Sequence, residues 1–150
     1  MLLGPVGVGK THLATALGHI AVRRRRSVHM ASAGKLVTRL TAARLDNSTD
    51  AEMRRLAHVD LLILDDFALQ PLDATQTTDF YELIVERHRK TATVLTSHRD
   101  PSEWLAMMAD PLLAHSAVDR LVSTAHELII EGDSYRRRQK PTHRTTTDAS

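Results

Sequence analysis

The chain has 150 residues, of which 42% are hydrophobic and 25% are charged, the proportions of a single globular domain with a core of its own. It contains no cysteine, which excludes a disulfide framework and a thiolate metal site and suits a reducing compartment. The apolar runs are too short to cross a bilayer and the N-terminus lacks the pattern of a secretion signal. We therefore predict a cytoplasmic protein that makes no contact with a membrane.

The first predicted element is a strand at Leu2 and Leu3, which leads directly into a phosphate-binding loop. Residues 4–11 match the pattern G-x-x-x-x-G-K-[ST] in full. In such a loop successive N–H groups surround a phosphate, Lys10 reaches the phosphate oxygens and the Thr11 hydroxyl binds Mg²⁺. The predicted nucleotide-binding residues are Gly4, Pro5, Val6, Gly7, Val8, Gly9, Lys10, Thr11 and His12.

Only three residues precede the loop, although a loop of this kind normally follows a complete buried strand. We therefore expect the first strand to be truncated at its N-terminus. The next element is a helix at 11–22, indicated by an apolar face made of Leu13, Leu17, Ile20 and Ala21. It is closed by Arg23, Arg24, Arg25 and Arg26. Two roles fit these cations equally well: they can stabilise the negative end of the helix dipole, or they can contact the phosphate backbone of a nucleic acid.

Strands and helices then alternate along the chain. We predict strands at 27–31, 60–66, 91–97 and 125–130, and helices at 33–45, 74–89, 104–108 and 113–121, with a short helix ending at Leu56 and a loop at 99–103. Because the central apolar runs do not alternate with polar residues, they indicate strands buried on both faces. The predicted fold class is α/β, a parallel sheet sandwiched by helices in a core at 1–138, followed by a polar, disordered tail at 139–150.

Polar side chains follow the predicted strands at their carboxyl ends, where parallel sheets bind their ligands. Asp65 ends one apolar run, and a carboxylate at this place holds the Mg²⁺ ion that bridges two phosphates. Asp66 follows it, and we expect this second acid to reach the attacking water. The plain alternative is a pair of acids that cap a surface turn.

Arg120 follows the helix after the fourth predicted strand. In oligomeric ATPases an arginine at this place is offered to the γ-phosphate of a neighbouring subunit. A local ion pair with Asp119 at the helix end is the alternative. The histidines show no metal-ligand spacing, and aromatic residues make up only 3% of the chain, which disfavours base stacking.

From Gly4 to Arg138 the chain resembles the ATPase domain of IstB-like transposition helper proteins, which are relatives of the DnaC helicase loaders within the AAA+ class of P-loop NTPases. The resemblance rests on the phosphate loop and on motifs such as Leu-Leu-Ile-Leu-Asp-Asp-Phe, Thr-Ser-His-Arg-Asp-Pro-Ser-Glu-Trp, Asp-Arg-Leu and Gly-Asp-Ser-Tyr-Arg. It implies an ATP- and Mg²⁺-binding regulator that assembles on duplex DNA as a homo-oligomer. Such a regulator assists a transposase in target selection and strand transfer.

The resemblance also implies roles for single residues. Lys10 and Thr11 hold phosphate and metal, Asp65 holds the metal, Asp66 orients water and Arg120 is the arginine finger. Ser97 and His98 stand at the sensor position, where the family usually has asparagine after Thr-Ser.

Two further hypotheses remain beside the transposition helper. The chain could be a helicase-loader-like adaptor in DNA replication, or a truncated remnant that is inactive alone. We expect hydrolysis of ATP to ADP and phosphate if the missing N-terminal part is present.

Overall fold

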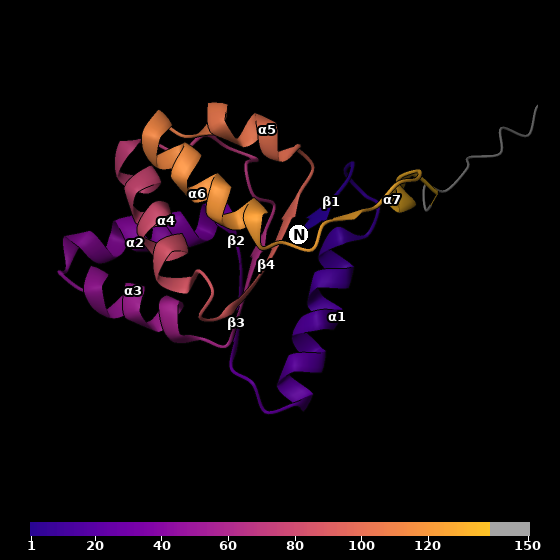
Figure 1. Ribbon diagram of the computed structural model, residues 1–150. Helices are drawn as coiled ribbons and strands as arrows, with labels where there is room; N and C mark the ends of the chain where they lie inside the picture. Colours follow the sequence, from indigo (N-terminus) through magenta and orange to yellow (C-terminus); the bar gives the residue numbers. More distant parts are fainter. Residues whose placement is uncertain (139–150) are drawn as a thin grey trace, which may run out of the picture.

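A computed structural model describes residues 1–138 of the chain, and the predicted polar tail at 139–150 lies outside the described residues. The described part contains a five-stranded sheet in the order β2-β3-β4-β1-β5, in which all neighbouring strands are parallel. The strands are β1 (Leu2–Leu3), β2 (Val28–Ser32), β3 (Leu61–Asp65), β4 (Ala92–Ser97) and β5 (Leu128–Ile129). This confirms the predicted α/β fold with a parallel sheet (Figure 1).

Helices lie on both faces of the sheet (Figure 1). They are α1 (Lys10–Arg23), α2 (Ala33–Leu45), α3 (Thr49–His58), α4 (Ala74–Arg87), α5 (Pro101–Trp104), the 3-10 turn η1 (Leu105–Met107), α6 (Pro111–Ser123) and α7 (Tyr135–Arg138). The predicted loop at 99–103 is wrong, because α5 begins there. Asp100 and Glu103 form a reciprocal capping box and Pro101 occupies the first turn, which together start a helix.

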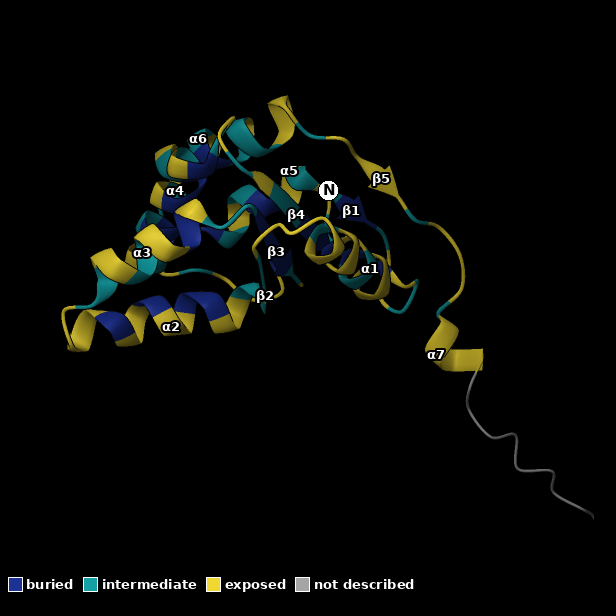
Figure 2. Cartoon of the chain, turned by 90° about the horizontal axis from the view of Figure 1, so that it is seen from below, coloured by how far each residue is buried: buried dark blue, intermediate teal, exposed yellow. Residues whose placement is uncertain are grey.

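The two faces of the sheet are packed very differently. On one face α2, α3, α4 and α6 cover a large core in which Phe67 stacks on Phe80 at 4.8 Å between ring centroids and meets Trp104 edge-on at 5.0 Å. In the described part of the chain, α1 is the helix on the opposite face (Figure 1). Figure 2 shows buried residues gathered on the strands and on the sides of the helices that face them.

The face of α1 that meets the sheet is made of small residues. Ala14 and Gly18 are buried, and a Cβ atom added to Gly18 would lie 3.0 Å from Cδ1 of Ile63. Leu13, Leu17 and Ile20 remain 37%, 36% and 47% exposed. Of the apolar stripe that indicated this helix in the sequence, only Ala21 packs on the sheet, beside Ala14 and Gly18, among the described residues.

The end of the described chain differs from the prediction as well. The last strand, predicted at 125–130, is only the two-residue β5, and both of its side chains are exposed. Its backbone nevertheless continues the sheet, because Ile130 N–H donates to the carbonyl of Leu3. No helix in residues 1–138 has the length and hydrophobicity needed to span a membrane.

Candidate nucleotide-binding site

The loop between β1 and α1 has a backbone that requires glycine. Gly7 has φ of 86°, in the left-handed region, and a Cβ atom there would lie 2.2 Å from Oγ of Ser134. Gly9 has φ of 99° and is the N-cap of α1, with open space on its Cβ side. The loop therefore leads into the positive end of a 14-residue helix, an arrangement suited to phosphate.

Lys10 is held beneath this loop. Its Nζ donates hydrogen bonds of 2.7 Å to the carbonyl oxygens of Gly4 and Pro5, and the residue is buried. Burial lowers the pKa of Lys10, while the nearby carboxylates of Asp66 and Asp65 act in the opposite direction. The ammonium group is thus fixed at the phosphate loop with two acids beside it.

Thr11 joins the loop to the end of β3. Its hydroxyl lies 2.9 Å and 3.0 Å from the two carboxylate oxygens of Asp65, although 54 residues separate them in the sequence. A hydroxyl and a carboxylate are the hard oxygen ligands that Mg²⁺ prefers, with water and phosphate completing its shell. No group of three His, Asp or Glu side chains in residues 1–138 is placed to hold a metal without such help. The pair therefore fits an ion that arrives with a nucleotide.

Thr96 is one of the polar residues at the carboxyl end of the fourth predicted strand but was not predicted as a site residue, yet it touches both predicted acids. Its hydroxyl donates to Oδ1 of Asp65 at 2.5 Å and accepts the backbone N–H of Asp66 at 3.0 Å. Asp66 is exposed and has φ of 54°, so its backbone is left-handed just after the strand. The sequence could not single out this residue, because Thr93, Thr96 and Ser97 all place a hydroxyl on β4.

The two predicted sensor residues take different places. Ser97 is completely buried, donates to the carbonyl of Phe67 at 2.8 Å, and accepts from the backbone N–H of Arg99 and from Trp104 Nε1. Its hydroxyl is used within the fold, facing the core and not the phosphate loop. His98 follows directly and is partly exposed, so the sensor prediction depends on that residue.

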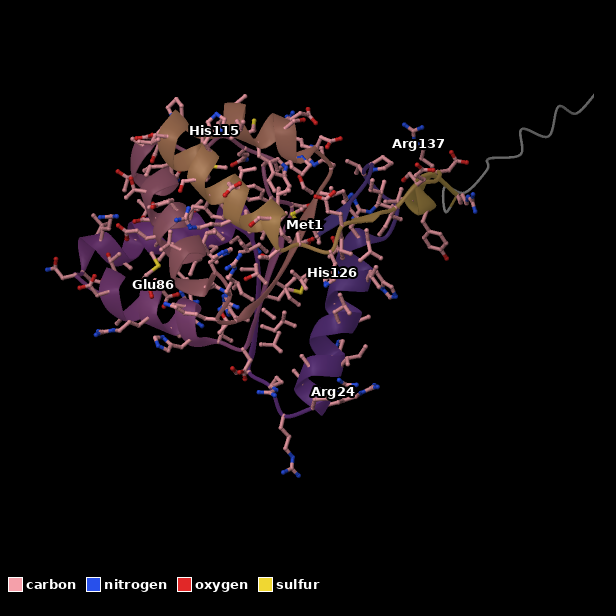
Figure 3. All side chains as sticks on the ribbon, in the orientation of Figure 1. Met1, Arg24, Glu86, His115, His126 and Arg137 are labelled. Carbon is pink, nitrogen blue, oxygen red and sulfur yellow. The ribbon has the colours of Figure 1, made fainter. Side chains whose placement is uncertain are left out.

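The C-terminal end of the described chain packs on the phosphate loop. Tyr135 N–H donates to the carbonyl of Gly7 at 2.9 Å, at the first residue of α7. Arg136, Arg137 and Arg138 follow on this turn, and Figure 3 labels Arg137 there. The motif Gly-Asp-Ser-Tyr-Arg was noted in the sequence, but its position beside the loop follows only from the fold.

Arg120 lies away from the phosphate loop of its own chain. Its Nη1 donates to the carbonyl of Ser116 at 3.0 Å and contacts the Ser116 hydroxyl, and its guanidinium lies 5.9 Å from the ring centre of Tyr81. It lines a cavity of about 410 Å³ with Met1 and Ala92, at the amino ends of β1 and β4. Among residues 1–138 the ion pairs include none between Arg120 and Asp119.

The four arginines at 23–26 are exposed at the C-terminal end of α1, where Figure 3 labels Arg24. Arg26 reaches Asp60 at 3.8 Å. A 14-residue helix is about 20 Å long, so this cluster and the phosphate loop lie at opposite ends of α1.

A parallel sheet, a phosphate loop between β1 and α1, and a carboxylate at the end of β3 define a P-loop domain of the AAA+ type. The chain belongs to the family of IstB-like ATP binding proteins, whose family model matches residues 1–143.

Two curated relatives are named for insertion sequences. One, from Mycobacterium tuberculosis, is named for ATP binding and is 40% identical over 98% of this chain and 59% of its own length. The other, the IS21 protein of Pseudomonas aeruginosa, is 36% identical over 93% of this chain and 53% of its own length. The chain therefore spans a little over half the length of these relatives.

Solved structures agree on the fold. AMPPCP-bound DnaA from Aquifex aeolicus superposes with a TM-score of 0.73 at 25% identity, over 91% of this chain and 41% of that one. The DnaC helicase loader superposes with a TM-score of 0.75 at 21% identity, over 87% and 76%.

Proposed function

We propose that this chain binds ATP together with Mg²⁺ at the phosphate loop. The observation that carries the proposal is the bond between Thr11 on the loop and Asp65 on β3, because it brings the two halves of a P-loop metal site together. The family and the AMPPCP-bound neighbour support ATP as the nucleotide. Bound Mg²⁺ supplies charge neutralisation between the β- and γ-phosphates.

The side chains of the site then have distinct tasks. The N–H groups at the start of α1 face the phosphates, and Lys10 exchanges the carbonyls of Gly4 and Pro5 for phosphate oxygens. Thr11 and Asp65 hold the metal. Asp66 is exposed beside them and orients the water that attacks the γ-phosphate, which makes ATP hydrolysis the expected reaction.

Lys10→Ala tests this assignment, with Lys90→Ala as the matched control because Lys90 is exposed and forms a surface ion pair with Glu86 at 3.5 Å. Titration of each variant with Mg²⁺-ATP should show affinity reduced by at least about tenfold for Lys10→Ala, the loss of one charge-assisted contact. The control should bind as the unchanged chain does. Equal affinities of Lys10→Ala and Lys90→Ala would contradict the site.

In its biological role, we propose that the protein is an ATP-dependent DNA-binding regulator that assists the transposase of an insertion sequence in target selection and strand transfer. The family and the names of the relatives support this role over that of a helicase-loader adaptor, because the likeness to DnaC extends to the fold alone. Arg120 faces away from its own phosphate loop, which suits a finger offered to the next copy in a homo-oligomer.

Duplex DNA is the proposed polymer, contacted by the exposed Arg23, Arg24, Arg25 and Arg26. The slope of log affinity against log salt for a duplex measures the number of phosphate contacts. Replacing the four arginines by alanine should flatten this slope by up to roughly 0.9 per lost contact. An unchanged slope would assign the cluster to the end of the helix alone.

Target selection by the transposase is tested by strand-transfer reactions with the transposase encoded in the same insertion sequence. The protein with ATP should raise the yield of strand transfer, and Lys10→Ala should not. Stimulation of a replicative helicase without any effect on strand transfer would favour the loader hypothesis. The ATP titration separates both from an inactive remnant.

A further inference from the structure

Thr96 stands where β3 and β4 stop pairing. The backbone ladder between these strands ends at Leu64 and Leu95, and the next two residues, Asp65 and Thr96, are joined by the side chains instead. The carbonyl of Thr96 also accepts the N–H of Phe67 at 2.9 Å. Thr96 therefore makes three of the bonds that fasten the segment with both acids to β4, and Ser97 adds one more at the carbonyl of Phe67.

The hydroxyl of Thr96 is used as a donor and as an acceptor at once. It donates to Oδ1 of Asp65 and accepts from the N–H of Asp66. Serine could replace it in both bonds, whereas valine, which has the same shape, could make neither. Thr96 itself is completely buried, so no water replaces a lost hydroxyl there without rearrangement.

The contact with Thr96 lies where the backbone of Asp66 is left-handed. A left-handed conformation is unfavourable for a residue other than glycine, by roughly 1 kcal/mol or more. Asp66 is exposed, and the bond to Thr96 is the one that the structure records for its N–H. Asp65, in turn, lies between two hydroxyls, that of Thr11 on the loop and that of Thr96 on β4.

We propose that Thr96 is a positioning residue for both carboxylates of the Mg²⁺-ATP site. It holds the Asp65 carboxylate toward Thr11 and holds Asp66 in the left-handed conformation that presents its side chain beside Lys10. Thr96 does not itself touch the nucleotide. The inference rests on the proposed function for its ligand, and on the hydrogen bonds alone for its geometry.

The test compares Thr96→Val and Thr96→Ser with the matched control Thr93→Val. Thr93 lies on the same strand, but its hydroxyl accepts a 3.0 Å hydrogen bond from Nε of the buried Arg87, away from the site. Thermal unfolding of each variant establishes that it is folded. Should Thr96→Val not fold, Thr96→Ala takes its place in the same measurements.

The first measurement is hydrogen exchange at the amide of Asp66, without nucleotide. Because this residue is exposed, its amide should exchange at least about tenfold faster in Thr96→Val than in the unchanged chain. Thr96→Ser and Thr93→Val should keep it protected. Equal exchange in Thr96→Val and the unchanged chain would overturn the inference.

The second measurement is ATP affinity with Mg²⁺ and with EDTA. Thr96→Val should bind ATP in EDTA within about twofold of the unchanged chain. The factor by which Mg²⁺ raises its ATP affinity should be at least about tenfold smaller than in the unchanged chain, because one metal ligand, Asp65, is no longer well placed. Thr96→Ser should recover most of this factor. An undiminished factor in Thr96→Val would overturn the positioning role.

Failure of the proposed function has a different signature. An unchanged chain that binds no ATP contradicts the nucleotide site. The exchange of the Asp66 amide then decides alone whether Thr96 fixes the segment that carries the two acids.

Discussion

One face of the sheet carries most of the buried core, and the other face carries the helix that begins at the phosphate loop. On the face covered by α2, α3, α4 and α6, the buried core contains Phe67, Phe80 and Trp104 and many leucines. On the α1 face the buried cluster is only Leu2, Ala14, Leu61 and Ile63. Yet α1 carries Lys10 and Thr11, two of the residues that we propose bind the nucleotide and its metal.

This difference explains how the site is built. Phe67, which follows the acids at the end of β3, is anchored in the heavily packed face, and Thr96 on β4 bonds to the acids themselves. The phosphate loop is fixed from the lightly packed face by a helix that offers little apolar area. Small residues let α1 approach the sheet closely, and the bond from Thr11 to Asp65 joins the two parts.

Trp104→Ala should give the largest loss of stability. Trp104 is fully buried, meets Phe67 edge-on and donates from Nε1 to Ser97 at 3.2 Å. Removing so large a side chain from a packed core typically costs about 3–5 kcal/mol. Urea unfolding followed by circular dichroism measures the change.

Ile20→Ala on α1 is the matched comparison, since Ile20 is 47% exposed on the other face. It should change the free energy of unfolding by less than about 0.5 kcal/mol, as surface substitutions usually do. Similar losses for Trp104→Ala and Ile20→Ala would break the distinction between the two faces.

Gly18→Val should give an intermediate effect that reaches the nucleotide site. A Cβ atom there already lies 3.0 Å from Ile63, so the larger side chain pushes α1 from the sheet. Overpacking of this kind costs about 1–3 kcal/mol. Because Lys10 and Thr11 move with the helix, ATP affinity measured by titration should fall as well.

Gly34→Val is the control, because the Cβ position of this glycine on α2 is open. It introduces the same side chain into a helix without the clash. If Gly34→Val lowered ATP affinity as much as Gly18→Val does, the close approach of α1 would not be the cause.

Several parts of this structure could be predicted from the sequence because each depends on a local pattern. The loop at 4–11 has a fixed spacing, and β3 is an unbroken apolar run that ends in Asp65. The prediction that these two segments meet holds, since Thr11 contacts Asp65. Parallel order follows from the alternation of strands and helices.

Other parts depend on contacts between distant segments. The inner face of α1 was not recognised because Ala14 and Gly18 carry little hydrophobic signal. Arg87 looks like an ordinary charge at a helix end, yet it is 2% exposed and its guanidinium donates to the carbonyls of Leu56 and Val59 at the end of α3. Burial lowers the pKa of Arg87 to about 10. No pattern in its own segment indicates that partner.

β2 is an edge strand of the sheet. Replacing His29 on this strand should have the smallest of these effects on the free energy of unfolding. Burial lowers the pKa of His29, and the cations of Arg55 and Arg39 lower it further, while Glu52 opposes them. Arg55 Nη1 lies 3.5 Å from Nδ1 of His29. The folded chain therefore binds a proton at this site less readily than the unfolded chain does.

The sign of the pH dependence follows from that lowered pKa. The contribution of neutral His29 to stability is complete above its ordinary pKa of about 6.5 and is lost as the pH falls below it. The urea midpoint of the unchanged chain should thus fall between pH 7.5 and pH 5.5 more steeply than that of His29→Gln. His115→Gln, at an exposed position on α6, should follow the unchanged chain. If His29→Gln kept the full slope, the proton that destabilises the chain would bind elsewhere, and β2 would be no more sensitive to pH than the two packed faces.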